Sequence, residues 1–455
     1  MPSQRKLFGT DGVRGKANTY PITPEIALLI GKATAHVFQA AGLGEKKAII
    51  GKDTRLSGYM LETAITSGML SMGMDVLAVG PMPTPAVANL IRSMGASCGV
   101  MITASHNHAN DNGIKIFGHD GFKLPDAVEA EIERYVLSGA INSEHIDSSN
   151  IGKAHRIDDA RGRYIEFAKS SIRNRSLKGL KVVLDCANGA AYYIAPLIFK
   201  ELGAEVIVTA SEPDGHNINY QCGATYSKHI SRLVKEHHAD VGIALDGDAD
   251  RVIFCDAAGH EINGDRIIGM CALDYAKRGK LAGNRVVVTG MSNLGLMEAM
   301  EQHNITVDVT AVGDRYVIEQ MLASGANIGG EQSGHVIFMD YATTGDGIVT
   351  ALHILQLMIT SGKTLAQLAG FMTEFPQVLK NIDVSKKPPI SELPKLSAVI
   401  DECTQALGKD GRTIVRYSGT ENKIRVLVEA RQAAAVELWC NKISEVIAQE
   451  LIVNG

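Results

Sequence analysis

The sequence predicts an α/β protein made of three similar doubly wound α/β domains, followed by a smaller α+β domain. An apolar strand, a loop of small polar residues, a helix and a second apolar strand recur three times, starting at Lys47, Lys181 and Arg285. Uninterrupted apolar strands that alternate with helices indicate parallel sheets covered on both faces. The pattern changes near Phe375, and a chain of 455 residues is too long for one core.

The three repeats span residues 47–80, 181–210 and 285–313. Their first strands read KAIIG, KVVLD and RVVVT, and their second strands read MDVLAVG, GAEVIVTA and TVDVTAVG. The common length of the units favours duplication of one βαβ unit over independent convergence on the same pattern.

The first helix is predicted from its ends and its apolar face. Thr23 suits the N-cap, Pro24 suits the first helical turn, and Gly42 follows the last periodic residue. One face of this helix is apolar: Ile26, Leu29, Ile30, Ala33 and Val37.

The C-terminal part differs from the repeats. Residues 375–394 contain Lys386, Lys387, Pro388 and Pro389 and read as an exposed linker. A helix over about 393–407, two short strands (TIVRYS and KIRVLVEA) and a terminal helix to about residue 451 follow. The expected domains are residues 1–155, 156–256, 257–373 and 374–455, and each carries one of the four polar loops described below.

Composition excludes several function classes. Hydrophobic residues make up 45% of the chain and charged residues 21%, which is ordinary for a globular protein. The net charge of −5 gives no sign of the excess of positive charge that nucleic-acid binding needs. No run of Lys or Arg suggests a membrane surface, and no segment has the roughly 18 apolar residues of a membrane span. Seven scattered cysteines without a CxxC pair favour buried free thiols. The N-terminus lacks an apolar signal-peptide core, so a soluble cytoplasmic protein is expected.

The first candidate site is the segment GVMITASHNHANDNGIKIFG, which begins at Gly99. Residues 99–103 read as a buried strand, so Ser105 lies where the strand ends and a loop opens, the place where α/β sheets bind ligands. Lys115 follows and can hold an anion near the serine. The alternative is a polar turn, since several turn-forming residues come after the serine: His106, Asn107, Asp111, Asn112 and Gly113.

The second loop, DGDADR, has three alternating carboxylates that can converge on one hard cation such as Mg²⁺: Asp246, Asp248 and Asp250. An EF-hand is excluded because its sixth and twelfth positions are Arg251 and Ala257 rather than Gly and Glu. A solvated acidic turn is the other alternative, although carboxylates at this spacing repel unless a cation lies between them. Arg251 can hold a phosphate beside the metal.

Two further loops carry polar groups between glycines. In GGEQSGH, Glu331 and Ser333 suit sugar hydroxyls and His335 can transfer a proton; a structural histidine is the alternative. In VRYSGTENKIR, hydroxyls and backbone N–H groups between cations can cradle a phosphate, unless the segment is an ordinary hairpin turn. The residues of this fourth loop are Arg416, Ser418, Gly419, Thr420 and Arg425. Weaker candidates are Arg14 in FGTDGVRG, and Lys52 and Arg55 in GKDTRLSG.

These four loops, TASHNH, DGDADR, GEQSGH and RYSGTE, resemble those of the α-D-phosphohexomutase superfamily along the whole chain. FGTDGVRG, GPMPTPAVA, PDGHNIN, MSNLGL and VGDRYV are similar to the bacterial phosphoglucosamine subgroup. Two positions depart from the superfamily pattern, because His108 and Asn422 stand where proline is usual. Either change can loosen its loop, but neither removes a group that the chemistry needs.

The resemblance implies four domains around a central cleft and a Mg²⁺-dependent phosphoenzyme. Phosphorylated Ser105 would convert glucosamine 6-phosphate into glucosamine 1-phosphate through glucosamine 1,6-bisphosphate, feeding UDP-N-acetylglucosamine and hence cell-wall synthesis. One Mg²⁺ would be held by Ser105 and the three aspartates, while Arg14, Lys115 and Arg251 stabilise charge and Lys115 or His335 transfers a proton. Glu331 and Ser333 would bind the sugar, and the fourth loop with Arg425 would bind the phosphate that is not reacting.

Three other functions remain open. The nearest is a sister phosphomannomutase or phosphoglucomutase, which uses a similar sugar loop. A phosphatase with an aspartate nucleophile in DGD would give Ser105 no role. A regulator that binds sugar phosphates without catalysis is disfavoured by the full set of catalytic groups. The expected partner is a small sugar phosphate, with neither nucleic acid nor membrane, and a homodimer is compatible with the resemblance.

Overall fold

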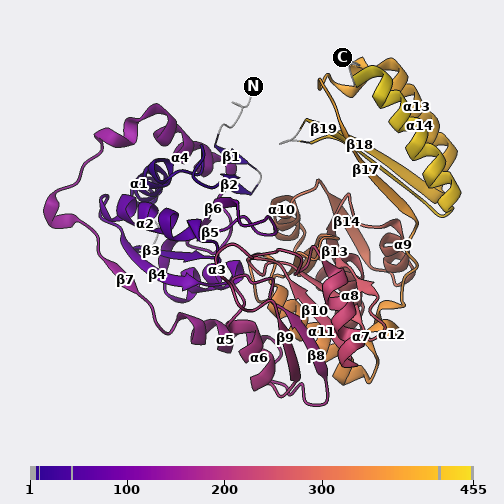
Figure 1. The fold of residues 1–455 in the computed structure, drawn as a ribbon, viewed down its shortest axis with the longest axis horizontal. Coiled ribbons are helices and arrows are strands. Elements are labelled where there is room, and N and C mark those ends of the chain that lie inside the picture. Colours follow the sequence, from indigo (N-terminus) through magenta and orange to yellow (C-terminus); the bar gives the residue numbers. More distant parts are fainter. Residues whose placement is uncertain (1–6, 10, 43–44, 419–421, 452–455) are drawn as a thin grey trace. The chain divides into compact units, whose positions relative to one another are not determined.

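The computed structural model describes residues 7–9, 11–42, 45–418 and 422–451, which fall into two units (Figure 1). The first unit comprises residues 1–291 and 304–371, and the second comprises residues 292–303 and 372–455. Within the described ranges, no helix has both the length and the apolar character needed to cross a membrane.

The first sheet of unit one has seven strands in the order β1-β2-β6-β5-β3-β4-β7. Only β5, β3, β4 and β7 are parallel, whereas β6, β2 and β1 add antiparallel strands. The predicted parallel strands are thus present, and the sheet continues with antiparallel strands that the sequence pattern did not indicate. The strands are β1 (Phe8–Gly9), β2 (Gly12–Lys16), β3 (Glu45–Lys52), β4 (Asp75–Pro81), β5 (Ala96–Ile102), β6 (Asp111–Gly118) and β7 (Ala154–Arg156), with helices α1 (Pro24–Ala41), α2 (Ser57–Leu70), α3 (Thr84–Ser93) and α4 (Asp126–Ser138).

Helix α1 confirms the predicted caps. The Thr23 hydroxyl accepts the Ile26 N–H at 3.4 Å, and Gly42 ends the helix at φ 64°, a left-handed conformation that favours glycine. The face of α1 that includes Ile30 and Ala33 is buried in the core of this sheet.

The second sheet has the order β12-β11-β10-β8-β9, and the third has the order β14-β13-β15-β16. Second-sheet elements are α5 (Ala160–Ser171), β8 (Lys181–Asp185), α6 (Ile194–Glu201), β9 (Glu205–Thr209), α7 (Ser227–His237), β10 (Val241–Leu245), β11 (Val252–Asp256) and β12 (Glu261–Ile262). Those around the third sheet are α8 (Gly264–Lys277), β13 (Arg285–Thr289), β14 (Thr306–Thr310), α10 (Asp314–Ser324), β15 (Ile328–Gly330), β16 (Val336–Phe338), α11 (Gly347–Ser361) and α12 (Leu365–Ala369).

The repeats predicted from the sequence pair as expected. The two strands of each repeat are parallel neighbours: β3 with β4, β8 with β9, and β13 with β14. Each sheet then adds an antiparallel strand after the parallel part, namely β6, β11 and β16. The loops before these added strands hold the first three candidate motifs.

Unit two is built on a three-stranded antiparallel sheet in the order β17-β19-β18. Its elements are α9 (Leu294–Gln302), β17 (Gln377–Asp383), α13 (Pro394–Leu407), β18 (Gly411–Tyr417), β19 (Lys423–Ala430) and α14 (Ala433–Leu451). Residues 377–383 were expected in a linker but form β17, because β19 supplies a full antiparallel partner. Only the proline-rich part after β17 lacks a strand.

All seven cysteines are buried free thiols, as the sequence predicts.

Candidate active site

Ser105 follows β5 and adopts a left-handed backbone conformation, with φ 51°. Its N–H donates to Thr103 Oγ1 at 2.9 Å, and its carbonyl oxygen accepts from Asn219 Nδ2 at 2.9 Å and Arg55 Nη2 at 3.3 Å. Such a conformation is costly for a residue other than glycine and persists where neighbours hold it. These three neighbours therefore fix the direction of the serine side chain, which is 1% exposed.

The Ser105 hydroxyl points at the loop between β10 and β11. It donates a 2.7 Å hydrogen bond to Asp246 Oδ2. The backbones also approach closely, because a Cβ on Gly247 would lie 2.5 Å from the Ser105 carbonyl oxygen. The glycine of DGD is thus required by contact with the serine loop. Two predicted motifs from different sheets form one site.

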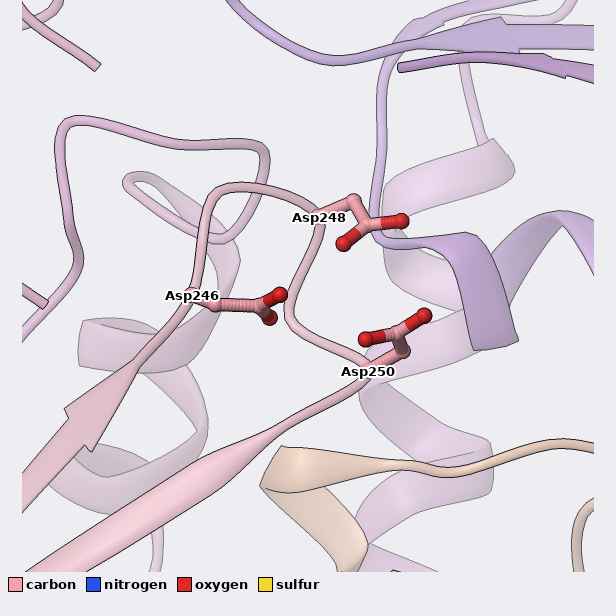
Figure 2. Close-up of side chains that lie close together, drawn as sticks. All are labelled: Asp246, Asp248 and Asp250. Carbon is pink, nitrogen blue, oxygen red and sulfur yellow. The ribbon is translucent and has the colours of Figure 1, made fainter. Parts of the chain in front are cut away.

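Asp246, Asp248 and Asp250 converge from this single loop (Figure 2). All three are buried, and one carboxylate oxygen from each lies within 4.8 Å of the others. Among the described residues, Asp248 Oδ1 and Asp250 Oδ1 have no hydrogen-bond donor. Burial, together with the other two carboxylates, raises the pKa of Asp246 well above its usual value. Buried oxygens without donors and mutual repulsion both fit a hard divalent cation.

Lys115, on β6, bonds to two of these aspartates. Its Nζ lies 2.9 Å from Asp248 Oδ2, 3.2 Å from Asp250 Oδ2 and 3.6 Å from Asp11 Oδ2. Burial opposes the charge of Lys115, but these carboxylates raise its pKa well above the ordinary value. The sequence suggested that Lys115 holds an anion near the serine; in the structure its ammonium group binds carboxylates. Asp11 was not predicted, although it lies in FGTDGVRG, where only Arg14 was singled out.

Arginine side chains complete the positive side of the site. The Arg14 guanidinium pairs with Asp11, and the backbone N–H of Arg251 donates to Asp246 Oδ1 at 3.1 Å. Arg251 Nη1 lies 2.9 Å from His106 Nδ1. Burial, with Arg251 and Arg14 adding repulsion, lowers the pKa of His106 to about 4, so this ring is neutral near pH 7 and accepts the arginine proton.

His335 also reaches the aspartate loop, from the turn between β15 and β16. Its Nδ1 lies 3.6 Å from Asp250 Oδ1, and its Nε2 accepts the Gly345 N–H at 3.0 Å. Burial disfavours the charged ring, but Asp250 and then Asp314 raise its pKa above the usual value. Because Gly345 occupies Nε2, a second proton on the ring requires that this contact break.

The sugar-binding candidates differ in exposure. Glu331 is half-buried, and its Oε1 accepts the Gly313 N–H at 3.2 Å, whereas Ser333 is exposed. The structure thus places His335 among the aspartates and leaves Ser333 open to a ligand. His108, at one of the unusual positions, lies edge-on to Tyr220 with ring centroids 6.4 Å apart.

The fourth loop belongs to unit two. Arg416 on β18 and Arg425 on β19 are direct cross-strand partners, and Ser418 is buried with its carbonyl oxygen bound by Lys387 Nζ at 2.9 Å. Burial and then Arg425 lower the pKa of Arg416. Paired cations of this kind favour an anion between them. Gly419 and Thr420 lie outside the described residues.

Comparison with known families matches four consecutive parts of the chain. Residues 5–141, 162–259 and 263–375 match the phosphoglucomutase/phosphomannomutase alpha/beta/alpha domains I, II and III, and residues 379–446 match the C-terminal domain of the same family. These matches confirm the predicted domain order, in which three α/β domains are followed by a fourth domain of a different kind.

Curated relatives match over nearly the full length. A phosphoglucosamine mutase of Pelobacter propionicus is 51% identical over 448 residues, covering 98% of this chain and 99% of the relative. One of Syntrophotalea carbinolica is 51% identical over 452 residues, covering 99% of each.

Solved structures share the fold at low identity. A phosphoglucomutase/phosphomannomutase family protein of Burkholderia thailandensis has a TM-score of 0.81 at 23% identity, over 97% of each chain. N-acetylphosphoglucosamine mutase of Aspergillus fumigatus, in complex with GlcNAc-6P and magnesium, has a TM-score of 0.67 at 18% identity, over 98% of this chain and 96% of that one.

Proposed function

Because the chain belongs to the phosphoglucosamine mutases of the phosphoglucomutase/phosphomannomutase family, we propose that it interconverts glucosamine 6-phosphate and glucosamine 1-phosphate. The observation that carries the proposal is the 2.7 Å hydrogen bond from the Ser105 hydroxyl to a buried aspartate of a three-carboxylate loop. A serine that is positioned beside clustered carboxylates suits phosphoryl transfer better than structural packing.

Ser105 is the proposed carrier of the phosphoryl group. In the forward direction the sugar O1 hydroxyl attacks the phosphorus on Ser105, the P–Oγ bond breaks, and a P–O1 bond forms. A nearby base accepts the O1 proton. The resulting glucosamine 1,6-bisphosphate, which also serves as activator, reorients in the site so that its other phosphate faces Ser105. Ser105 Oγ then attacks the phosphorus on O6, the P–O6 bond breaks, and O6 takes back the proton that the base removed from O1. Glucosamine 1-phosphate leaves, and the phosphoserine is regenerated.

Asp246, Asp248 and Asp250 would hold one Mg²⁺ per chain, with Ser105 as the further ligand; their donor-free buried oxygens fit this role. When bound, the ion neutralises charge on the transferring phosphoryl group. Unit one supplies the other charges from Arg14 and Arg251, which lie beside Asp11 and Asp246.

His335 is the proposed proton-transfer group. Lys115 is less suited to act as a base, because its neighbouring carboxylates keep it protonated. Its proposed role is therefore to keep two of the metal-binding aspartates in place. Exposed Ser333 and half-buried Glu331 are the proposed contacts to sugar hydroxyls.

The fourth loop is the proposed clamp for the phosphate that is not reacting: Arg416, Ser418, Gly419, Thr420 and Arg425. The opposed arginines support this assignment. We also infer a cytoplasmic enzyme that supplies amino-sugar phosphate for UDP-N-acetylglucosamine. The domain boundaries near residues 155, 256 and 373 and a homodimer stay predictions.

The direct test incubates the protein with Mg²⁺, glucosamine 6-phosphate and a trace of the 1,6-bisphosphate, and quantifies glucosamine 1-phosphate. Glucose 6-phosphate is run in parallel, as is Ser105→Ala. Preferred turnover of the amino sugar, abolished in the variant, is expected. Faster turnover of glucose 6-phosphate would assign the chain to a sister activity, and release of free phosphate by an unimpaired variant would exclude the serine mechanism.

A further inference from the structure

A second concave site lies in unit one between the end of α5, the end of α8 and the middle of α11. Its volume is about 220 Å³, and its lining includes Arg173, Arg175, Arg278, Lys280 and His353. None of its lining residues belongs to the serine, metal or sugar loops. This basic pocket, as we call it, therefore has no part in the proposed phosphoryl transfer.

The charged side chains that line the basic pocket are all positive. Its lining holds four Lys and Arg side chains and no Asp or Glu, in a chain whose net charge is −5. Arg278 is paired with Asp274. Arg173, Arg175 and Lys280 are exposed, and no carboxylate of the described residues lies within ion-pair distance of them. Three positive charges thus lie around one small cavity without a direct ion pair, although Asp274 interacts with Lys280 at longer range.

The inner wall of the pocket carries a polar group that packing does not satisfy. His353 is 9% exposed and stacks on Phe338, with ring centroids 4.6 Å apart. Its Nε2 has no hydrogen-bond partner among the described residues. Burial, with repulsion from Arg278 and Lys280, lowers the pKa of His353 to about 4, so the ring is neutral near pH 7 and retains one N–H.

Cations near the ends of α5 and α8 also stabilise the helix dipoles, which is an ordinary role for such residues. That role does not explain a cavity, nor a buried imidazole without a partner. Arg173 closes the last turn of α5, because its backbone N–H donates to the Ser170 carbonyl oxygen at 2.8 Å, but Arg175 lies beyond that turn.

We propose that the basic pocket binds a phosphate or diphosphate group of a small metabolite, held by Arg173, Arg175, Arg278 and Lys280. Planar guanidinium groups match phosphate oxygens, and the neutral His353 lies against the same cavity. The volume is below the roughly 300 Å³ at which pockets for drug-sized ligands begin, which suits a compact anion. The anion would join segments from the second and third sheets of unit one.

A chain of direct contacts connects the basic pocket to the metal loop. Helix α5 packs on α11, and Tyr164 of α5 donates hydrogen bonds to both carboxylate oxygens of Asp346, at 2.9 and 2.8 Å. Asp346 caps α11, and the next residue, Gly347, donates its N–H to Ala249 of the metal loop at 3.0 Å. Helix α11 thus extends from the basic pocket, at His353, to the metal loop, and α5 packs along it.

The test titrates the full chain with sodium pyrophosphate in chelator-treated, phosphate-free buffer. Calorimetry gives the affinity, and histidine side-chain NMR reports the place of binding. The His353 resonance is assigned by its loss in His353→Gln. The variant pair Arg173→Glu/Arg175→Glu changes exposed residues, and Lys200→Glu/Lys228→Glu is matched to it in charge change and exposure.

Pyrophosphate is expected to shift the His353 resonance in the wild type and in the lysine pair, and to bind at least about tenfold more weakly at this site in the arginine pair. Inorganic phosphate and ADP are run as further arms. Tighter binding of ADP identifies a nucleotide as the source of the phosphate, and tighter binding of pyrophosphate identifies an inorganic source. A His353 resonance that none of the three anions moves, while His335 responds, would overturn the proposal and leave the cations as helix-end charges. The outcome does not depend on the mutase assay.

Discussion

The Lys115 ammonium group lies 2.9 Å from Asp248 Oδ2, inside the cluster of aspartates proposed to bind a metal. Both groups are almost fully buried. A buried charge without a partner is strongly destabilising, so Lys115, the cation that pairs with two of the three clustered carboxylates, stabilises the cluster when no metal is bound. Lys115 and the metal then share one set of carboxylates, and the loss of either should make the chain more dependent on the other.

Replacement Lys115→Met should therefore lower the free energy of unfolding by about 3 kcal/mol in the presence of a chelator. Added Mg²⁺ should restore more stability to this variant than it adds to the wild type, because the ion supplies the missing positive charge. Urea unfolding with and without Mg²⁺ measures both effects. Lys228→Met, at an exposed position, is the control. Equal gains from Mg²⁺ in Lys115→Met and wild type would contradict this account.

Asp248→Asn should weaken divalent-metal binding by about tenfold or more, because one of three carboxylate ligands loses its charge. Mn²⁺ titration followed by electron paramagnetic resonance measures the affinity and the number of sites. One site per chain is expected in the wild type. Asp401→Asn, at an exposed position in unit two, should leave the Mn²⁺ affinity unchanged. An Asp248→Asn protein with wild-type affinity would remove the loop as the metal site.

Sequence alone predicted the two loops that meet in the structure, because each follows a recognisable strand. Ser105 and Asp246 come directly after β5 and β10, and their meeting follows from the motif types. Asp11 and Asn219 lie in the motifs FGTDGVRG and PDGHNIN, but they were missed because a single polar residue gives no local signal of contact with a distant loop. Their role appears only when the chain folds and Asn219 binds the Ser105 carbonyl oxygen.

Strand β17 was missed for a different reason. Its residues alternate between exposed and half-buried positions and carry few apolar side chains, so they resemble the proline-rich segment that follows. What makes β17 a strand is pairing with β19, which lies far along the chain. Pairing of this kind is a tertiary effect that local propensity does not contain.

The opposed arginines of unit two give a prediction about substrate binding. Arg416→Gln should raise the KM for the sugar phosphate by about tenfold while changing kcat less, since a clamp on the non-reacting phosphate acts on both ground and transition states. Steady-state assays with the amino-sugar phosphate provide the two constants. Lys409→Gln, an exposed neighbour in the same unit, should match the wild type. A variant that loses kcat at unchanged KM would instead place Arg416 at the reacting phosphate.

Burial of His353 makes stability fall in acid. The folded state holds the pKa of this ring at about 4, below the value of about 6.5 expected in the unfolded chain. The unfolded state therefore binds more protons between these two values, and stability rises with pH across that window. From pH 7 to pH 5 this one group should cost the wild type about 2 kcal/mol, a loss that His353→Gln should not share.

Urea unfolding at pH 5 and pH 7 in phosphate-free buffer, for wild type and His353→Gln, isolates this contribution as the difference between the two pH dependences. Phosphate must be absent, because an anion in the basic pocket would favour the protonated ring and reduce the loss. His145→Gln, at an exposed position, controls for the substitution itself. If His353→Gln loses as much stability in acid as the wild type, the histidine is protonated in the folded state at pH 5. The charged ring would then add to the attraction of the basic pocket for an anion at that pH.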